Sequence, residues 1–211
     1  MSLESSLFVA VVVVVVGWFA VGTQINVRKG HRLLAWLQSG LPLIGERTTL
    51  RWLGSSAVEL RIASAHAPFR RAEVVVVLEP RDVPPVWLWS RLQRRRDLII
   101  FRGELQQRPR LRLELLSREA WPLLSGERDA LRCGWPPLAL DAAGFRAWAP
   151  QPVPQLPRLL ALAELPGLPL LRLAVREENH RIELNWRLVQ PGAGDAQKLF
   201  AAVYAVVQQI G

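Results

Sequence analysis

The sequence has little of what a disulfide scaffold or a metal site needs. Cys133 is the single cysteine among 211 residues, so no intramolecular disulfide can form. The histidines His31, His66 and His180 are far apart, and none has a second His or Cys at metal-ligand spacing. We therefore expect no metal ion, and the simplest role for Cys133 is that of a small buried thiol.

Motifs that would indicate an enzyme are also lacking. The sequence contains no G-x-S-x-G, no P-loop and no Rossmann fingerprint. We expect no catalytic residues, no cofactor and no small-molecule substrate, and so no enzyme. A hydrolase with dispersed catalytic residues stays open as an alternative.

Lysine is nearly absent, because Lys29 and Lys198 are the only two, yet the formal net charge is +9. Residues 26–118 carry 18 basic and 8 acidic residues, whereas residues 119–211 carry 9 of each. The basic surplus therefore lies beside the N-terminal segment. The abundance of arginine is explained either by codon bias or by preference for phosphate, which a guanidinium binds with two parallel hydrogen bonds. Disorder is excluded as the main state, because 50% of the residues are hydrophobic.

Charge and proline are absent from residues 7–25, which include the run VVVVVV. As a helix these residues measure about 28 Å, close to the hydrocarbon thickness of a bilayer. We therefore predict a transmembrane anchor over residues 1–25. A cleaved signal peptide with Ala20-Val21-Gly22 as its cleavage site is the less favoured alternative, because it would lack a basic N-terminal region.

The flanks of this segment predict its orientation. Only Glu4 is charged before the span, whereas Arg28, Lys29 and Arg32 follow it. The positive-inside rule then places the N-terminus outside and the rest of the chain in the cytoplasm. The expected location is the cell membrane, with a single span.

A basic amphipathic helix is expected over residues 26–45. Apolar residues, among them Trp36 and Leu37, recur at helical spacing, and the basic residues fall mostly on the other side. One interpretation is a helix at the lipid surface, with Trp36 and Leu37 at the membrane interface. The other is a helix that packs on the domain below it. The sequence favours neither.

Residues 46–211 are predicted to form a cytoplasmic α+β domain. Alternating or β-branched patterns predict strands over residues 48–53, 58–63, 72–78, 98–105 and 111–115, and later over 170–176 and 181–188. The strand over 72–78 is expected to be buried on both faces, and 98–105 with 111–115 to form a pair. Helices are expected over 86–95 and 196–210. The fold class is a mixed or antiparallel sheet with segregated helices, behind a single transmembrane helix.

Residues 117–167 are proline-rich and less regular. Within them we expect loops, a short strand at 145–149 and a helix at 156–165. Among the nine tryptophans, Trp52, Trp148 and Trp186 fall in strand-like segments and are expected in the core.

Basic residues form two dense groups. The first is the arginine cluster of Arg91, Arg94, Arg95 and Arg96, at the end of a predicted helix where cations favour the helix dipole. The second includes Arg110 and Arg112, which would share one face of a strand. With the residues that follow the span, these groups are candidates to face lipid or RNA phosphate. The full set is Arg28, Lys29, Arg32, Arg91, Arg94, Arg95, Arg96, Arg110 and Arg112.

The order of parts resembles the calumin-like family, single-span subunits of the eukaryotic PAT complex, which assists multipass membrane proteins at the translocon. The matching parts are the span at 7–25, the basic link at 26–32 and the segment WLQSGLPLIG at 36–45. They continue with VWLWSRLQRRR, RIELNWRLV, a PGAGD loop at 191–195 and a closing helix. The acidic luminal segment and the basic coiled-coil tail of that family have no counterpart here, and no individual functional residue carries over.

Anchor, orientation and membrane-proximal charge together give a functional hypothesis. We expect a non-enzymatic, membrane-anchored domain that assists the insertion or assembly of membrane proteins. Its partners would be the membrane and the ribosome, the translocon or another membrane protein, with no role for DNA. The alternative is a structural accessory subunit of a larger membrane complex.

Overall fold

The computed structural model describes residues 2–120, 126–140, 144–189 and 195–211, and opens with one long helix. Helix α1 (Leu3–Gln38) is continuous through both the predicted span and most of the predicted membrane-proximal helix, so the expected boundary at residue 25 is not a break. The side chain of Ser2 caps its start by accepting a hydrogen bond from the N–H of Ser5. Ser39 and Gly40 end it, and the single turn α2 (Leu41–Ile44) follows with a proline in its first turn.

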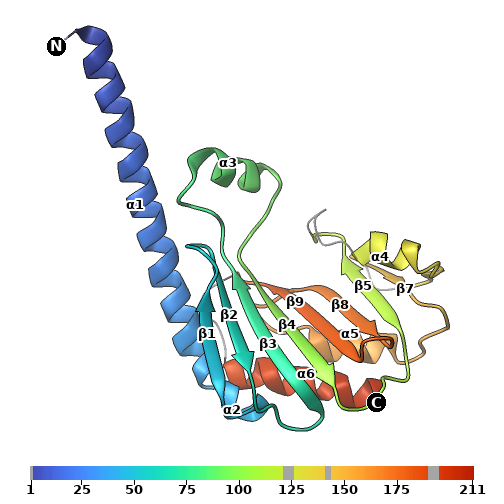
Figure 1. Cartoon of the computed structure of the whole chain (residues 1–211). Coiled ribbons are helices and arrows are strands. Elements are labelled where there is room, and N and C mark those ends of the chain that lie inside the picture. The colour runs from blue at the N-terminus through green and yellow to red at the C-terminus, as the bar shows by residue number, and fades with distance from the viewer. Residues whose placement is uncertain (1, 121–125, 141–143, 190–194) are drawn as a thin grey trace.

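The rest of the chain is an α+β unit built on one open sheet (Figure 1). The described residues form nine strands, and every pairing between them is antiparallel, in the order β1-β2-β3-β4-β9-β8-β5-β7-β6. The predicted fold class is therefore confirmed at the level of an apolar N-terminal helix and an antiparallel α+β sheet. The strands are β1 (Thr48–Trp52), β2 (Ala57–Ile62), β3 (Phe69–Val77), β4 (Leu98–Leu105), β5 (Leu113–Ser117), β6 (Pro137–Leu138), β7 (Phe145–Trp148), β8 (Leu170–Arg176) and β9 (Arg181–Arg187).

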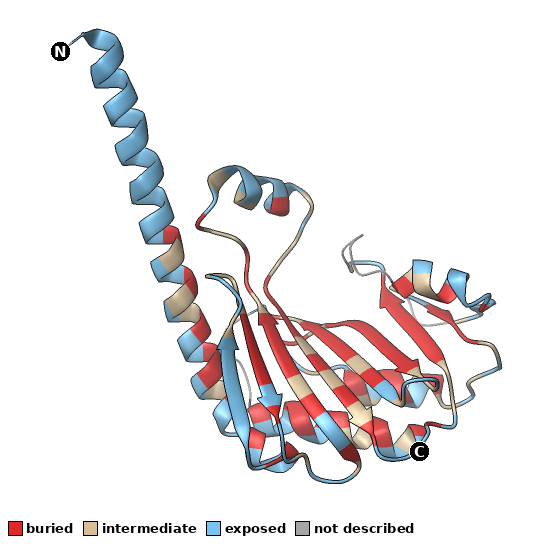
Figure 2. Cartoon of the chain, viewed as in Figure 1, coloured by how far each residue is buried: buried red, intermediate tan, exposed pale blue. Residues whose placement is uncertain are grey.

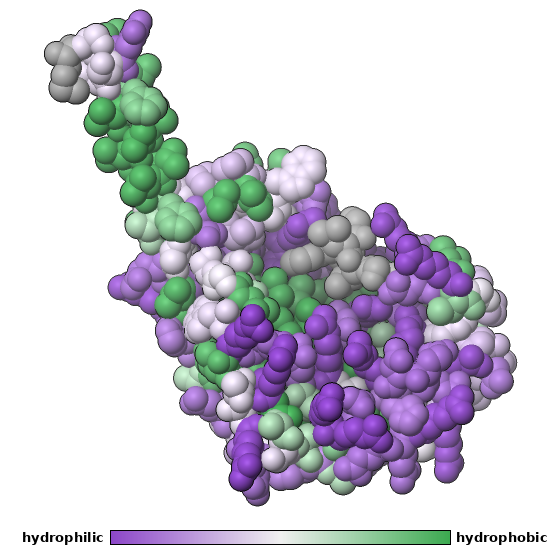
Figure 3. Space-filling model, viewed as in Figure 1, coloured by the Kyte–Doolittle hydropathy of each residue, from purple (hydrophilic) through white to green (hydrophobic). Residues whose placement is uncertain are grey.

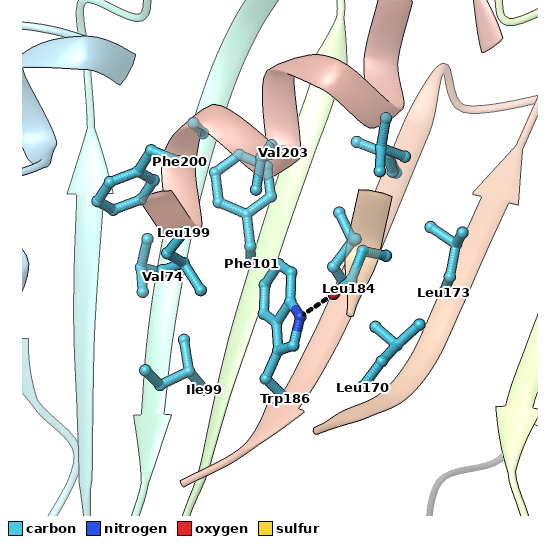
Figure 4. Packing of buried hydrophobic residues seen from close by; sticks show 14 of the residues in the cluster. Val74, Ile99, Phe101, Leu170, Leu173, Leu184, Trp186, Leu199, Phe200 and Val203 are labelled. Atoms are coloured by element: carbon cyan, nitrogen blue, oxygen red, sulfur yellow. Dashed lines mark hydrogen bonds between the residues drawn. The ribbon is translucent and has the colours of Figure 1, made fainter. Parts of the chain in front are cut away.

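Helices α5 (Leu156–Ala163) and α6 (Ala196–Ile210) cover one face of this sheet, with α2 beside α6. Between them and the strands lies the main core, in which Phe101, Trp186 and Phe200 are fully buried (Figures 2 and 4). The indole N–H of Trp186 donates to the carbonyl oxygen of Ala163 on α5, so this buried donor is satisfied. The core position predicted for Trp186 is confirmed.

The other face of the sheet carries a row of ion pairs, and a short helix over residues 126–132 packs on the β5 end of it. Arg102 on β4 lies between Glu73 on β3 and Glu183 on β9, and Arg172 on β8 joins Glu183 to the fully buried Glu114 on β5. These pairs cross five strands. The prediction that β3 is buried on both faces is therefore correct only in part.

The predicted pairing of 98–105 with 111–115 is wrong. Strand β4 pairs with β3 and β9, whereas β5 pairs with β8 and β7. The hairpin of β8 and β9 is inserted between them, so β5 lies three strand positions from β4, about 14 Å away. Arg110 and Arg112 precede β5 and do not lie on a strand.

The proline-rich stretch contains more structure than was predicted. The short strand β7 and helix α5 are confirmed, and α4 (Gly126–Arg132) and β6 are additional. Cys133 follows α4 and is exposed, so the expected buried thiol is wrong. The glycine-rich loop at 191–194 lies outside the described residues.

Candidate membrane-proximal site

Helix α1 is attached to the domain along one stripe, which we call the docking stripe. Its buried residues recur at spacings of three and four, so they share one side of the helix. Two of them are glycines because the neighbouring chain comes too close for a side chain. A Cβ at Gly22 would lie 2.3 Å from the carbonyl oxygen of Arg81, and one at Gly30 would lie 2.5 Å from the ring of Trp52. The stripe consists of Gly22, Asn26, Gly30, Leu33, Leu34 and Leu37.

Above the docking stripe α1 projects beyond the sheet, and its contact with the domain there is made by Trp18. Residues before Gly22 are exposed, and the best apolar window of the helix has a mean hydropathy of 2.4. Among the described residues it is the one helix long and apolar enough to cross a membrane. Figure 3 shows this apolar length standing out from a largely hydrophilic body.

Asn26 begins a set of buried polar groups that we call the polar junction, made of Asn26, Lys29, Glu79, Arg81 and Asp97. The amide nitrogen of Asn26 donates to the carbonyl oxygen of Glu79 at 3.0 Å, and its oxygen accepts from Arg81 at 3.0 Å. Asn26 is fully buried, so both bonds are made away from water. The junction thus joins α1 to the segment between β3 and α3.

Asp97 is the anionic centre of the polar junction. It forms an ion pair with Lys29, accepts from both terminal nitrogens of Arg81 at 3.3 and 3.2 Å, and accepts from the N–H of Glu79 at 2.6 Å. Burial alone would raise the pKa of Asp97, but the hydrogen bond from Lys29 and the charge of Arg81 outweigh burial and hold the pKa below its ordinary value. Asp97 is therefore held as a carboxylate.

Glu79 links the polar junction to the next helix. Its carboxylate is buried and accepts from the indole N–H of Trp87 at 3.2 Å and from Arg91 at 3.4 Å. Arg81 and Arg96 lie 3.6 and 3.8 Å from it. Three arginines therefore surround one carboxylate, and two of them come from α3 or the residues that follow it.

Helix α3 (Pro84–Leu92) lies beside α1, away from the sheet (Figure 1). The ring of Trp87 is 5.9 Å from the ring of Trp18 on α1, whose indole N–H donates to the carbonyl oxygen of Arg81 at 2.9 Å. The side of α3 turned away from the domain is apolar and exposed. Its exposed fractions rise from 46% at Val86 through 56% at Leu88 and 59% at Trp89 to 71% at Leu92.

A groove of about 490 Å³ runs between α1 and α3. One wall is apolar and comes from α1, and the ring of Trp87 lies opposite. Arg81 and Arg91 also line it, and the guanidinium of Arg91 lies 5.2 Å over the ring of Trp87. The residues from α1 are Val13, Val14, Gly17, Trp18, Val21, Gly22 and Ile25.

The structure separates the predicted membrane-proximal residues. Arg28 and Arg32 are exposed, whereas Lys29 belongs to the polar junction. Leu37 is fully buried in the main core, and Trp36 packs against that core. The interpretation of this helix as packed on the domain is therefore correct for Leu37, and its assignment to the membrane interface is wrong, because α6 and the sheet already cover it.

The arginine cluster lies just past α3. The helix ends at Leu92 and not at Arg95, so only Arg91 occupies the last turn. Arg94 is exposed and has a positive φ of 55°, in the tight turn that leads back to β4. Arg96 lies near Glu79 and donates to the carbonyl oxygen of Arg95.

Arg110 and Arg112 do not join that cluster. They follow β4 at the end opposite to α3, and the eight residues of β4 separate the two ends by about 24 Å. Arg112 is paired with Glu177 at 3.2 Å, and the N–H of Arg110 donates to the carbonyl oxygen of Ile210. The two basic groups recognised in the sequence are thus also separate in space.

Sequence reasoning missed Glu79, Arg81 and Asp97. A usable signal was present on α1, where Gly22, Asn26 and Gly30 repeat at intervals of four. Small residues and an amide at that spacing are typical of a helix that packs closely on a neighbour. No local pattern pointed to residues that lie more than fifty positions away.

Within the described parts of the chain, no three His, Cys, Asp or Glu side chains gather as metal ligands would. A scan of protein-family models found no match to this chain, and a search of curated proteins found no significant relative.

Proposed function

We propose that the chain is a non-enzymatic, membrane-anchored domain that assists the insertion or assembly of membrane proteins at the cytoplasmic face. The upper part of α1 would span the bilayer with its N-terminus outside. The arginine cluster and α3 would lie at the lipid surface and meet the ribosome, the translocon or anionic lipid. The resemblance to the calumin-like family is part of this proposal.

The observation that carries the proposal is the position along the axis of α1 at which α3 packs against it. The exposed stretch of α1, residues 3–21, measures about 28 Å as a helix, which matches the hydrocarbon thickness. Near the lower end of this stretch, Trp18 contacts Trp87 on α3. If α1 spans the bilayer, α3 lies at the membrane–water interface, and its exposed apolar side can be buried in lipid.

Charge supports the same arrangement. Residues 79–97 contain five arginines against three carboxylates, so a cationic surplus sits at the level of the lipid phosphates. Each basic residue near an anionic surface contributes about 1 kcal/mol to binding. Arg110 and Arg112 are at the far end of the domain and are left out of this surface.

Charge reversal tests the proposal. In full-length protein, replacing Arg94, Arg95 and Arg96 with glutamate should weaken co-sedimentation with ribosomes or anionic liposomes, and the loss should shrink as salt rises. The matched control reverses Arg108, Arg110 and Arg112, which are equal in number and lie at the far end. Equal effects of the two triple variants, or no effect of the first, would count against the proposal.

The alternative is a structural accessory subunit of a larger membrane complex. Strand β1 favours it, since it is an edge of the sheet within the described residues and its own residues, including Leu50, are largely exposed. Pull-down in mild detergent discriminates the two. Stoichiometric recovery with one complex supports the subunit, and substoichiometric recovery of ribosome or translocon supports the assisting factor.

A further inference from the structure

The groove between α1 and α3 is open to whatever surrounds the upper part of α1. Its walls are the apolar side of α1 and the ring of Trp87, and its lower rim carries Arg81 and Arg91. Gly17 leaves its middle empty, since a Cβ at that position would have no neighbour within 4 Å. The groove is therefore apolar along its length and cationic at the end nearest the domain.

Its size favours a chain thinner than a helix. One turn of an α-helix, about 10 Å across and 5.4 Å high, occupies about 400 Å³. The groove holds about 490 Å³ over a length of α1 that runs from Val13 to Ile25, about 18 Å. A second helix would fill that volume with little more than one turn, whereas an extended hydrocarbon chain fits the elongated shape.

Charge favours an anionic end for that chain. Arg81 contacts Asp97, Glu79 and Asn26, whereas Arg91 is 51% exposed and, among the residues that the structure describes, is paired with Glu79 alone. The stacking of Arg91 on Trp87 fixes its guanidinium at the rim. Arg94 and Arg96 follow within five residues, and a guanidinium fork is suited to bind phosphate oxygens.

We propose that the groove between α1 and α3 binds one acyl chain of an anionic phospholipid, with the lipid phosphate held by Arg91. This inference rests on the proposed insertion of α1 into a bilayer. The chain would lie along Val13, Gly17 and Val21, and the headgroup would sit beside the arginine cluster. The lipid would then fill the space between α1 and α3 that the protein itself leaves empty.

Photolabelling of the full chain in phosphatidylcholine vesicles tests the proposal. The probe is phosphatidylglycerol with a diazirine on one acyl chain, and tandem mass spectrometry locates the labelled residues. We expect labels on the groove side of α1 and on α3. The variant Arg91→Gln should reduce them about fivefold, the effect of losing one phosphate contact.

A second variant avoids the polar junction. Gly17→Leu projects into the empty middle of the groove and should abolish labelling there, while Val12→Phe adds bulk on the opposite side of α1 and should leave it unchanged. Each variant is first checked for co-flotation with the vesicles.

Four results would overturn the inference. Uniform labelling around α1, or equal labelling by a phosphatidylcholine probe, would contradict the lipid site but not the proposed membrane anchor. A photo-crosslinker at Val13 that captures a second polypeptide assigns the groove to a protein helix instead. Failure of the unaltered chain to co-float with vesicles removes both the anchor and the lipid site.

Discussion

Gly22 lies against the backbone of Arg81, with room for a hydrogen atom but not for a methyl group. The same carbonyl oxygen of Arg81 accepts from the indole of Trp18, one turn earlier on α1. One turn later, Asn26 accepts from the side chain of Arg81. A single residue of the domain is thus held by three successive turns of α1, and the missing side chain at position 22 makes this approach possible.

Two glycines of α1 give opposite predictions. Gly22→Ala should destabilise the attachment of α1 by about 1–3 kcal/mol, because its methyl group would overlap the carbonyl of Arg81. Gly17→Ala should stabilise the helix by up to about 1 kcal/mol, because its methyl group meets nothing. Thermal unfolding in detergent micelles measures both. The prediction fails if the two variants shift the midpoint in the same direction.

The polar junction should be sensitive to the loss of Asp97. Replacing Asp97 with asparagine leaves Lys29 without its ion-pair partner and Arg81 with Glu79 alone, which should cost roughly 3 kcal/mol of unfolding free energy. Denaturant titration followed by tryptophan fluorescence measures the loss. Glu104→Gln is the matched control, because its partner Arg70 is exposed, and it should change the free energy by less than about 1 kcal/mol.

The same carboxylate predicts a dependence on pH. Because the pKa of Asp97 is lower in the folded than in the unfolded chain, its contribution is complete above the unfolded value of about 3.9. It is lost as the pH falls through the folded pKa. The gap in unfolding free energy between the unaltered protein and Asp97→Asn should therefore narrow below about pH 4. A gap that widens toward acid pH would contradict the assignment.

Cys133 allows a direct test of orientation. It is the only cysteine and is exposed, so no other residue has to be replaced first. If the domain is cytoplasmic, a membrane-impermeant maleimide should label Cys133 only after cells are permeabilised. Cys133→Ser combined with Ser2→Cys is the control, and it should be labelled in intact cells. Labelling of Cys133 in intact cells would reverse the proposed topology.

Local patterns in the sequence predicted the elements well, because a strand or a helix is specified by its own periodicity. Strand β4 and helix α6 have the predicted bounds, and the side chain of Asp195 caps the start of α6 by accepting a hydrogen bond from the N–H of Gln197. The ends of α3 and β3 were displaced by a few residues. At these ends, tertiary contacts such as those of Glu79 decide where the element stops.

The order of the strands in the sheet could not be predicted from local sequence patterns. The proximity of β4 and β5 in sequence suggested a hairpin, yet Leu105 is followed by a long connection and β9 takes the free edge of β4. Pairing between distant strands depends on which apolar faces match in three dimensions, and a single sequence does not display this. The hydrogen bond from Arg81 to Asn26 could not be predicted for the same reason, because the two residues are 55 positions apart in sequence.

The strand order has a consequence for the nascent chain. Strands β8 and β9 leave the ribosome after β4 and β5, yet they occupy the space between them. During translation the sheet therefore exists as two unjoined pieces, each with an apolar face that α6 has not yet covered. Tyr204 on α6 finally donates to the carbonyl of Leu43, beside the base of α1. The base of α1, which is synthesised first, therefore completes its packing only after α6, one of the last segments, has been made. During this delay chaperones have access to the domain.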